Sequence, residues 1–210
     1  MEVQSLDFKK LFISEELPYK GRSRRDKFLS RVFGIFNEEI IRIWCKNERS
    51  SYVNLGRPTV YDVDGKNFTL DFLLKDKDGN LFLSEMKCEI EYQKYKYLVL
   101  EDPKQLEHHR KKRAFQIFIE MASNPNKHLV KCNSEEVHVS GAILIWGKVS
   151  DGGRKLVEEN FKLSGVISTE SVIKDLIEWK DESYLDFISE YNSWCNELFS
   201  SLKGDDKPNN

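Results

Sequence analysis

The sequence lacks any long apolar run. No stretch of its 210 residues approaches the roughly 18 consecutive apolar residues that a membrane-spanning helix needs. The charged start MEVQSLDFKK also has no apolar segment of the signal-peptide kind. We therefore expect a cytoplasmic protein without a membrane span. Its content of 40% hydrophobic and 12% aromatic residues suffices for the core of one ordinary globular domain.

Cysteine is scarce and scattered. Cys45, Cys88, Cys132 and Cys195 lie far apart in the chain, and no CxxC pair is present. Spacing of this kind argues against a structural zinc site or a disulfide framework. Free thiols are typical of a reducing compartment.

Net charge is small as well. At −2 it does not by itself indicate nucleic-acid binding, but positive charge is concentrated in two blocks, 20–27 and 110–113. Such blocks can form an electropositive face, although they are more often simply solvated surface. The candidate phosphate contacts in them are Arg22, Arg24, Arg25, Arg110, Lys111 and Arg113. We expect the neighbouring His108 and His109 to lie at the surface.

Apolar periodicity and turn residues predict an α/β fold. In chain order the predicted elements are a helix over 28–46, a β-meander of strands over 59–63, 68–75 and 81–90, a helix over 103–123, a strand over 137–146, and helices over 170–179 and 184–202. Asp26 and Asp102 should cap the first two helices, and Gly204 should end the last. The order predicts helices packed on a mixed sheet, in which the strand over 137–146 joins after a helical crossover.

The pattern of an acidic residue, any residue and lysine occurs several times and is uninformative alone. Glu85-Met86-Lys87 is the copy that falls inside a predicted strand. There the two-residue period of a strand places Glu85 and Lys87 on the same face.

The turn between the last two strands of the meander decides what lies opposite Glu85. A three-residue loop over 77–79, with Gly79 in the left-handed region, pairs Asp76 with Asn80 and therefore Asp71 with Glu85. A two-residue Asp78-Gly79 loop would instead put Met86 opposite Asp71. We favour the first register, because it alone keeps the charged residues together.

Two carboxylates about 5 Å apart repel by roughly 3 kcal/mol at an effective dielectric near 20. A divalent cation would offset this repulsion, and carboxylate oxygens suit Mg²⁺ or Mn²⁺. The alternative is a solvated hairpin face on which Lys87 simply pairs with Glu85 or Asp71.

A helix bearing glutamate, an aspartate on one strand and Glu-x-Lys on the next, then a helix and a strand, resembles the PD-(D/E)XK nuclease superfamily. The resemblance covers Phe28 to Trp146, with Leu70 in the place of the name-giving proline. It implies a restriction-endonuclease-like fold: a mixed β-sheet flanked by helices. It further implies one nuclease-like domain over 1–210, with an N-terminal extension (1–26), a nuclease core (28–146) and a flexible tail (203–210).

The resemblance also implies residue roles. Asp71, Glu85 and the backbone carbonyl of Met86 would bind Mg²⁺, with Mn²⁺ as a substitute, and Lys87 would hold the attacking water. The superfamily places a supporting glutamate on the first helix. Glu39, at the edge of the predicted apolar face, is favoured over Glu38, although a glutamate there can equally pair with an arginine.

A glutamine-x-x-x-tyrosine element of some exonuclease-like branches resembles Gln93 to Tyr97, which adds Gln93, Lys94 and Lys96 to the candidate nucleic-acid contacts. The expected function is a Mg²⁺-dependent endonuclease that hydrolyses DNA, of restriction or defence type. Cutting two strands with one site per chain indicates a homodimer. The alternatives are a nuclease-like fold that binds nucleic acid or protein without cutting, and an α/β interaction protein with a solvated acidic hairpin.

Overall fold

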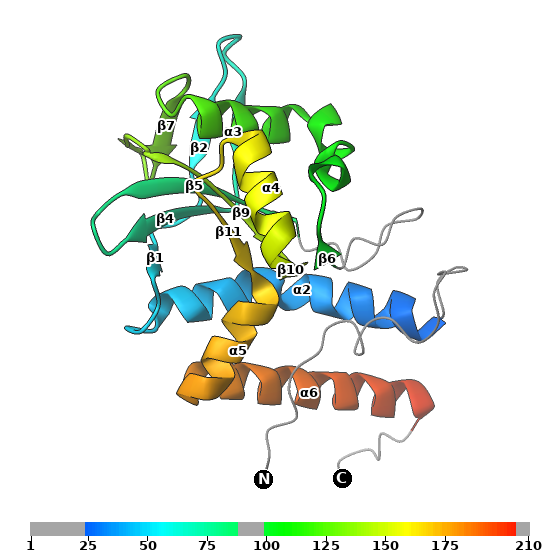
Figure 1. Ribbon diagram of the computed structural model, residues 1–210. Helices are drawn as coiled ribbons and strands as arrows, with labels where there is room; N and C mark the ends of the chain where they lie inside the picture. Colours follow the sequence, from blue (N-terminus) through cyan, green and yellow to red (C-terminus); the bar gives the residue numbers. More distant parts are fainter. Residues whose placement is uncertain (1–23, 88–98, 205–210) are drawn as a thin grey trace. The chain divides into compact units, whose positions relative to one another are not determined.

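The computed structural model describes residues 24–87 and 99–204 (Figure 1). The chain divides into two compact units, Met1–Lys174 and Asp175–Asn210. The candidate hairpin belongs to the first unit.

The first unit is built around a five-stranded sheet in the order β1-β4-β5-β9-β11. Its strands are β1 (Tyr52–Asn54), β4 (Phe72–Asp76), β5 (Leu81–Lys87), β9 (Gly141–Trp146) and β11 (Gly165–Ser168). The pairs β1–β4 and β4–β5 are antiparallel, whereas β5–β9 and β9–β11 are parallel. The predicted α/β fold with a mixed sheet is therefore confirmed, and β9 joins it beside β5 as expected.

The predicted meander is wrong. Phe68 lies in β3 (Asn67–Thr69), which pairs with β2 (Thr59–Tyr61), whereas Phe72 opens β4 in the other sheet. Between them the N–H of the buried Leu70 donates to the carbonyl of Pro58 at 2.9 Å. The chain thus changes sheets at Leu70 and Asp71, and alternation along one strand cannot reveal a change of partner.

The second sheet has the order β3-β2-β7-β8 and includes β7 (Leu129–Cys132) and β8 (Glu135–Glu136). A separate two-stranded parallel pair joins β6 (Val99–Leu100) to β10 (Lys148–Val149). Strands β6, β7, β8 and β10 were not predicted. The strand predicted over 137–146 is β9, which begins only at Gly141.

The first long helix, α2 (Arg24–Lys46), contains the predicted helix and packs against β1. It begins two residues before Asp26, so the predicted cap at Asp26 is wrong. The predicted helix over 103–123 is also only partly right. It consists of two short 3₁₀ turns, η1 (Pro103–Leu106) and η2 (His109–Lys111), followed by α3 (Arg113–Ser123). Asp102 caps the first turn as predicted.

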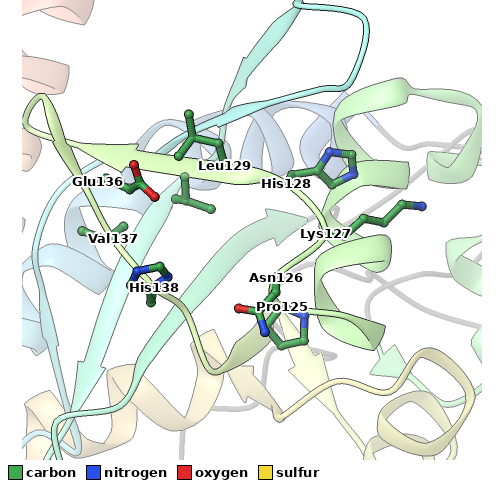
Figure 2. Close-up of a pocket in the computed structure, with 9 residues that line it drawn as sticks. Pro125, Asn126, Lys127, His128, Leu129, Glu136, Val137 and His138 are labelled. Carbon is green, nitrogen blue, oxygen red and sulfur yellow. The ribbon is translucent and has the colours of Figure 1, made fainter.

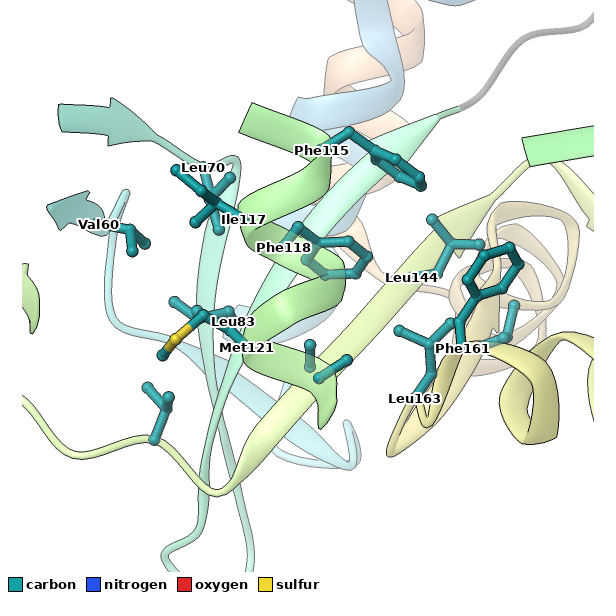
Figure 3. Close-up of a cluster of buried hydrophobic side chains, with 14 of the residues drawn as sticks. Val60, Leu70, Leu83, Phe115, Ile117, Phe118, Met121, Leu144, Phe161 and Leu163 are labelled. Carbon is teal, nitrogen blue, oxygen red and sulfur yellow. The ribbon is translucent and has the colours of Figure 1, made fainter. Parts of the chain in front are cut away.

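Helix α3 and the unpredicted α4 (Asp151–Phe161) pack on strands β5, β9 and β11. Figure 3 shows Phe118 and Met121 of α3 lying over Leu83 and Leu144 of the sheet, and all four side chains are fully buried. Residues on the opposite sheet face, such as Phe72, are buried too. Both faces of the sheet are therefore covered, as parallel strands require.

Two helices close the chain, α5 (Thr169–Trp179) and α6 (Glu182–Lys203), and both match the prediction. Gly204 ends α6 in the left-handed conformation, at φ 77°, again as predicted. Within the two described ranges, no helix has the length and apolar character to cross a bilayer.

Candidate active site

The β4–β5 hairpin brings Asp71 and Glu85 together. Leu73 pairs with Leu83 and Phe72 with Ser84, so the next residues outward are Asp71 and Glu85. The three-residue loop behind this register is confirmed. The N–H of Asp76 donates to the carbonyl of Asn80 at 3.0 Å, and Gly79 has φ +88°.

The Asp71 side chain is held at the end of the ladder. Its Oδ2 accepts a 2.7 Å hydrogen bond from the N–H of Met86, and its Oδ1 lies 3.6 Å from Nη2 of Arg57. The side chain is 17% exposed. One oxygen is thus fixed by backbone while the other faces a cation.

Glu85 and Lys87 form a close ion pair. Nζ of Lys87 lies 2.5 Å from Oε1 of Glu85 and 3.1 Å from the carbonyl of Met86. Burial raises the pKa of the Glu85 carboxyl; the Lys87 ammonium opposes this rise, and the charge of Asp71 adds to it. The predicted metal-binding carbonyl therefore belongs to the same cluster as the two carboxylates and the lysine.

Arg57 connects this cluster to helix α2. Its Nη1 lies 3.9 Å from Oε2 of Glu38, and Arg42 pairs with the same glutamate at 3.2 Å. Glu39, the favoured helix carboxylate, pairs with Arg42 at 3.5 Å. Among the described residues it is therefore Glu38 that is linked through Arg57 to Asp71.

The sequence offers Glu38 only as the less favoured of two candidate glutamates, and it does not point to Arg57. The two glutamates are similarly exposed, at 42% and 38%, so the periodicity of α2 does not separate them. Arg57 lies in the irregular segment between β1 and β2, where no pattern points to it.

His109 corrects another prediction. It was expected at the surface but is 2% exposed, with its ring against those of Phe115 and Trp146. Burial, assisted by His108 and Lys87, lowers the pKa of His109 to about 3, so the imidazole is neutral near Lys87. The 3₁₀ turns, which replace the predicted regular helix, give this residue its inward position.

The predicted nucleic-acid contacts fall into four groups. Arg110 and Lys111 are exposed on η2. Arg113 is engaged, because its guanidinium pairs with Asp62 at 2.6 Å and with Glu120 at 2.6 Å. Arg24 and Arg25 lie in α2. Arg22, Gln93, Lys94 and Lys96 lie outside the described residues.

A pocket of about 240 Å³ lies elsewhere, at the β7–β8 edge of the second sheet (Figure 2). The loop before β7 and the segment after β8 line it, with Asn126, Glu136 and His138 among the side chains at its wall. It contains neither candidate carboxylate, so it is a feature separate from the hairpin site.

The donor set at the hairpin suits a hard cation. Two carboxylates and one carbonyl are oxygen ligands, and Mg²⁺ usually keeps several waters while it is held by one or two carboxylates. In the described part of the chain, no group of three or more His, Cys, Asp or Glu side chains is arranged to hold a metal ion. A Mg²⁺ site of this kind does not need such a group.

Comparison of the chain with family models, curated proteins and solved structures finds no match to any of them.

Proposed function

We propose that this chain is a Mg²⁺-dependent nuclease that hydrolyses phosphodiester bonds in DNA. The register of the β4–β5 hairpin carries the proposal. It brings two carboxylates, one backbone carbonyl and a lysine to one end of β5. These groups suit metal-assisted phosphodiester hydrolysis, with oxygen ligands for the cation and a positive charge beside the attacking water.

The charges of the cluster support a cation. Burial raises the pKa of Glu85, Lys87 opposes that rise and the charge of nearby Asp71 adds to it, and the pKa stays raised overall, as expected where burial makes a carboxylate costly. Asp71, Glu85 and the carbonyl of Met86 would hold Mg²⁺. The bound ion would lower the pKa of its water and offset charge in the transition state.

Lys87 has two tasks in this proposal. Its ammonium, now 2.5 Å from Glu85, would orient the attacking water and stand beside the scissile phosphate. The neutral imidazole of His109 adds no positive charge that would compete with Lys87 for the phosphate.

The order of elements supports a restriction-endonuclease-like arrangement. A helix with glutamates (α2) precedes the hairpin β4–β5, and a helix (α3) and a parallel strand (β9) follow. Exposed Arg110 and Lys111 on η2 would contribute phosphate contacts, and a homodimer would supply the second site for duplex cleavage.

The test is cleavage of linear, supercoiled and single-stranded DNA by the purified chain with Mg²⁺, Mn²⁺ or EDTA. Asp71→Asn, Glu85→Gln and Lys87→Ala should each abolish cleavage. Lys75→Ala is the matched control, because Lys75 lies exposed on the same hairpin. Cleavage that survives the first three substitutions would reject the proposal.

One observation favours a second candidate, a nuclease-like module that binds nucleic acid or protein without cutting. Both carboxylates already have cationic neighbours, Lys87 for Glu85 and Arg57 for Asp71. Salt-dependent DNA binding, with no cleavage of any substrate and no Mn²⁺ binding at Asp71, would favour this candidate.

A further inference from the structure

Arg57 contacts two carboxylates that come from different elements. Its guanidinium lies 3.6 Å from Asp71 and 3.9 Å from Glu38, and its side chain is 49% exposed. Both distances exceed that of a hydrogen bond, so these are attractions between charges without a fixed donor geometry. Surface contacts of this kind are weak and easily exchanged.

The backbone around Arg57 is, in contrast, firmly anchored beside Asp71. The N–H of Leu55 donates to the carbonyl of Leu73, and the N–H of Leu73 donates to the carbonyl of Gly56, each at 2.8 Å. On the other side, the N–H of Leu70 donates to the carbonyl of Pro58 at 2.9 Å. Arg57 is therefore tied to the chain on both sides of Asp71, while its guanidinium is half in solvent.

The contact with Asp71 engages the carboxylate oxygen that is more open to a metal ion. Oδ2 accepts the hydrogen bond from the N–H of Met86, so Oδ1 is the oxygen without a backbone partner in that contact, and Oδ1 is the atom that faces Arg57. A divalent cation on Oδ1 and the guanidinium would repel each other. Occupancy by the cation must therefore turn Arg57 away from Asp71.

We propose that Arg57 is a phosphate-binding residue of this site, which neutralises Asp71 and Glu38 in the metal-free protein and is released to the DNA backbone when a cation binds. This inference rests on the proposed nuclease function and names a substrate contact for it. Arginine suits the task, since its planar guanidinium donates two parallel hydrogen bonds to a phosphate. Its anchored backbone would keep it at the site throughout the exchange.

The exchange makes cation binding and DNA binding cooperative. A cation that frees Arg57 strengthens phosphate binding, and by linkage DNA strengthens cation binding by the same factor. Removal of Arg57 should remove most of that coupling and, at the same time, raise the affinity of the metal-free site for cations.

The first experiment measures Mn²⁺ affinity in the absence of DNA, by calorimetry and by the electron paramagnetic resonance signal of free Mn²⁺. Arg57→Ala should bind Mn²⁺ about three- to tenfold more tightly than the natural chain, because a competing positive charge is gone. Arg57→Lys should stay close to the natural chain. Arg49→Ala is the charge-matched control with unchanged affinity. Arg49 is exposed in the turn before β1, whose Tyr52 pairs with Asp76 at the far end of β4 from Asp71.

The second experiment measures binding of a short DNA duplex with and without Mn²⁺, in a Lys87→Ala background so that no substrate is consumed. Mn²⁺ should tighten DNA binding by severalfold, and Arg57→Ala should remove most of that gain while Arg49→Ala preserves it. Equal or weaker Mn²⁺ binding by Arg57→Ala would overturn the competition. A Mn²⁺-dependent gain that persists without Arg57 would overturn the phosphate contact.

These outcomes are separable from the fate of the proposed function. If the natural chain cuts no DNA but Mn²⁺ and DNA bind cooperatively through Arg57, the nuclease assignment fails and the role of Arg57 is supported. If the chain cuts DNA and Arg57→Ala changes neither affinity, the nuclease assignment is supported and the role of Arg57 is rejected.

Discussion

The N–H of Met86 donates a 2.7 Å hydrogen bond to Oδ2 of Asp71. Asp71 lies just outside β4, where the chain has switched from one sheet to the other. Its side chain bonds to β5 just beyond Phe72 and Ser84, the last residues at that end that pair between β4 and β5. The bond has two consequences. It fixes the carboxylate beside Glu85 and Lys87, and it gives Asp71 a structural role that can be separated from its charge.

Asp71→Asn should therefore fold normally and lack nuclease activity. The amide oxygen can still accept from Met86, so the free energy of unfolding should stay within about 0.5 kcal/mol of the natural chain. Cleavage should fall by about 10²-fold or more, because the cation loses a charged ligand. Denaturant unfolding and a cleavage assay measure the two effects.

Asp71→Ala serves as the comparison for that variant. It leaves the Met86 N–H without its carboxylate, which should cost about 1–2 kcal/mol of stability, partly offset by relief of repulsion with Glu85. Equal stabilities of the two variants would show that the hydrogen bond does not hold the hairpin end.

Lys87→Ala should destabilise the protein through Glu85. The side chains of the pair are 18% and 9% exposed, so loss of Lys87 leaves a shielded carboxylate without its ammonium. We expect a loss of about 1–2 kcal/mol at pH 7 and a further rise in the pKa of Glu85. The double variant Lys87→Ala/Glu85→Gln should be more stable than the sum of the two single changes gives, which a double-mutant cycle from denaturant unfolding measures. Strictly additive changes in stability would contradict the coupling.

Glu85→Gln should stabilise the protein at neutral pH while abolishing cleavage. Burial raises the pKa of Glu85, with Lys87 opposing and Asp71 assisting, so the folded state disfavours the charged carboxylate. A neutral amide avoids that cost, and the gain should be about 1 kcal/mol or less. Such a result would mark Glu85 as a residue kept for function at the expense of stability.

The pH dependence of that gain has a defined sign. Because the folded-state pKa of Glu85 lies above the ordinary value of 4.5, the natural chain gains stability as pH falls through the raised pKa. The advantage of Glu85→Gln should therefore be full above the raised pKa and vanish by about pH 4.5. Unfolding curves between pH 8 and 4 test this; an advantage that grows on acidification would show that the pKa is lowered.

The hairpin was predictable because its information is local. Gly79 and the residues around it specify the loop, and the loop fixes the register that joins Asp71 to Glu85. The choice between the two glutamates and the role of Arg57 were not predictable. Those contacts join α2, the irregular segment that carries Arg57, and Asp71 just before β4, and no spacing in the sequence predicts that these three segments lie together.

Helix α4 was missed for a different reason. Gly152 and Gly153 stand in its first turn, and two glycines suppress the helical signal. Gly153 is buried where the helix passes the backbone of Leu100 and Glu101, so closely that any side chain would collide with it. Tertiary packing thus demands a residue that local propensity disfavours.

The last prediction concerns a charge network away from the hairpin. Arg113 of α3 pairs with Asp62, which follows β2, and with Glu120 of its own helix, while His128 contacts Glu120 at 2.7 Å. Hydrogen bonding to Arg113 lowers the pKa of Asp62 to about 2. For Glu120, burial works to raise the pKa, but hydrogen bonds from Arg113, His128 and Lys127 outweigh it and lower the pKa to about 2.

Because these folded-state pKa values are depressed, the network stabilises the protein fully above the ordinary values of 3.8 and 4.5. That contribution is lost progressively as pH falls toward about 2. Asp62→Asn should therefore lower the melting temperature at pH 7, by about 3–8 °C, and should flatten its decline between pH 4.5 and 2. Glu107→Gln, which disturbs only the exposed pair with Arg110, is the matched control and should leave both unchanged. An acid transition as steep in Asp62→Asn as in the natural chain would mean that other carboxylates govern acid stability. The ion pair of Arg113 with Asp62 would then contribute little to stability, and Arg113 could serve as a phosphate contact.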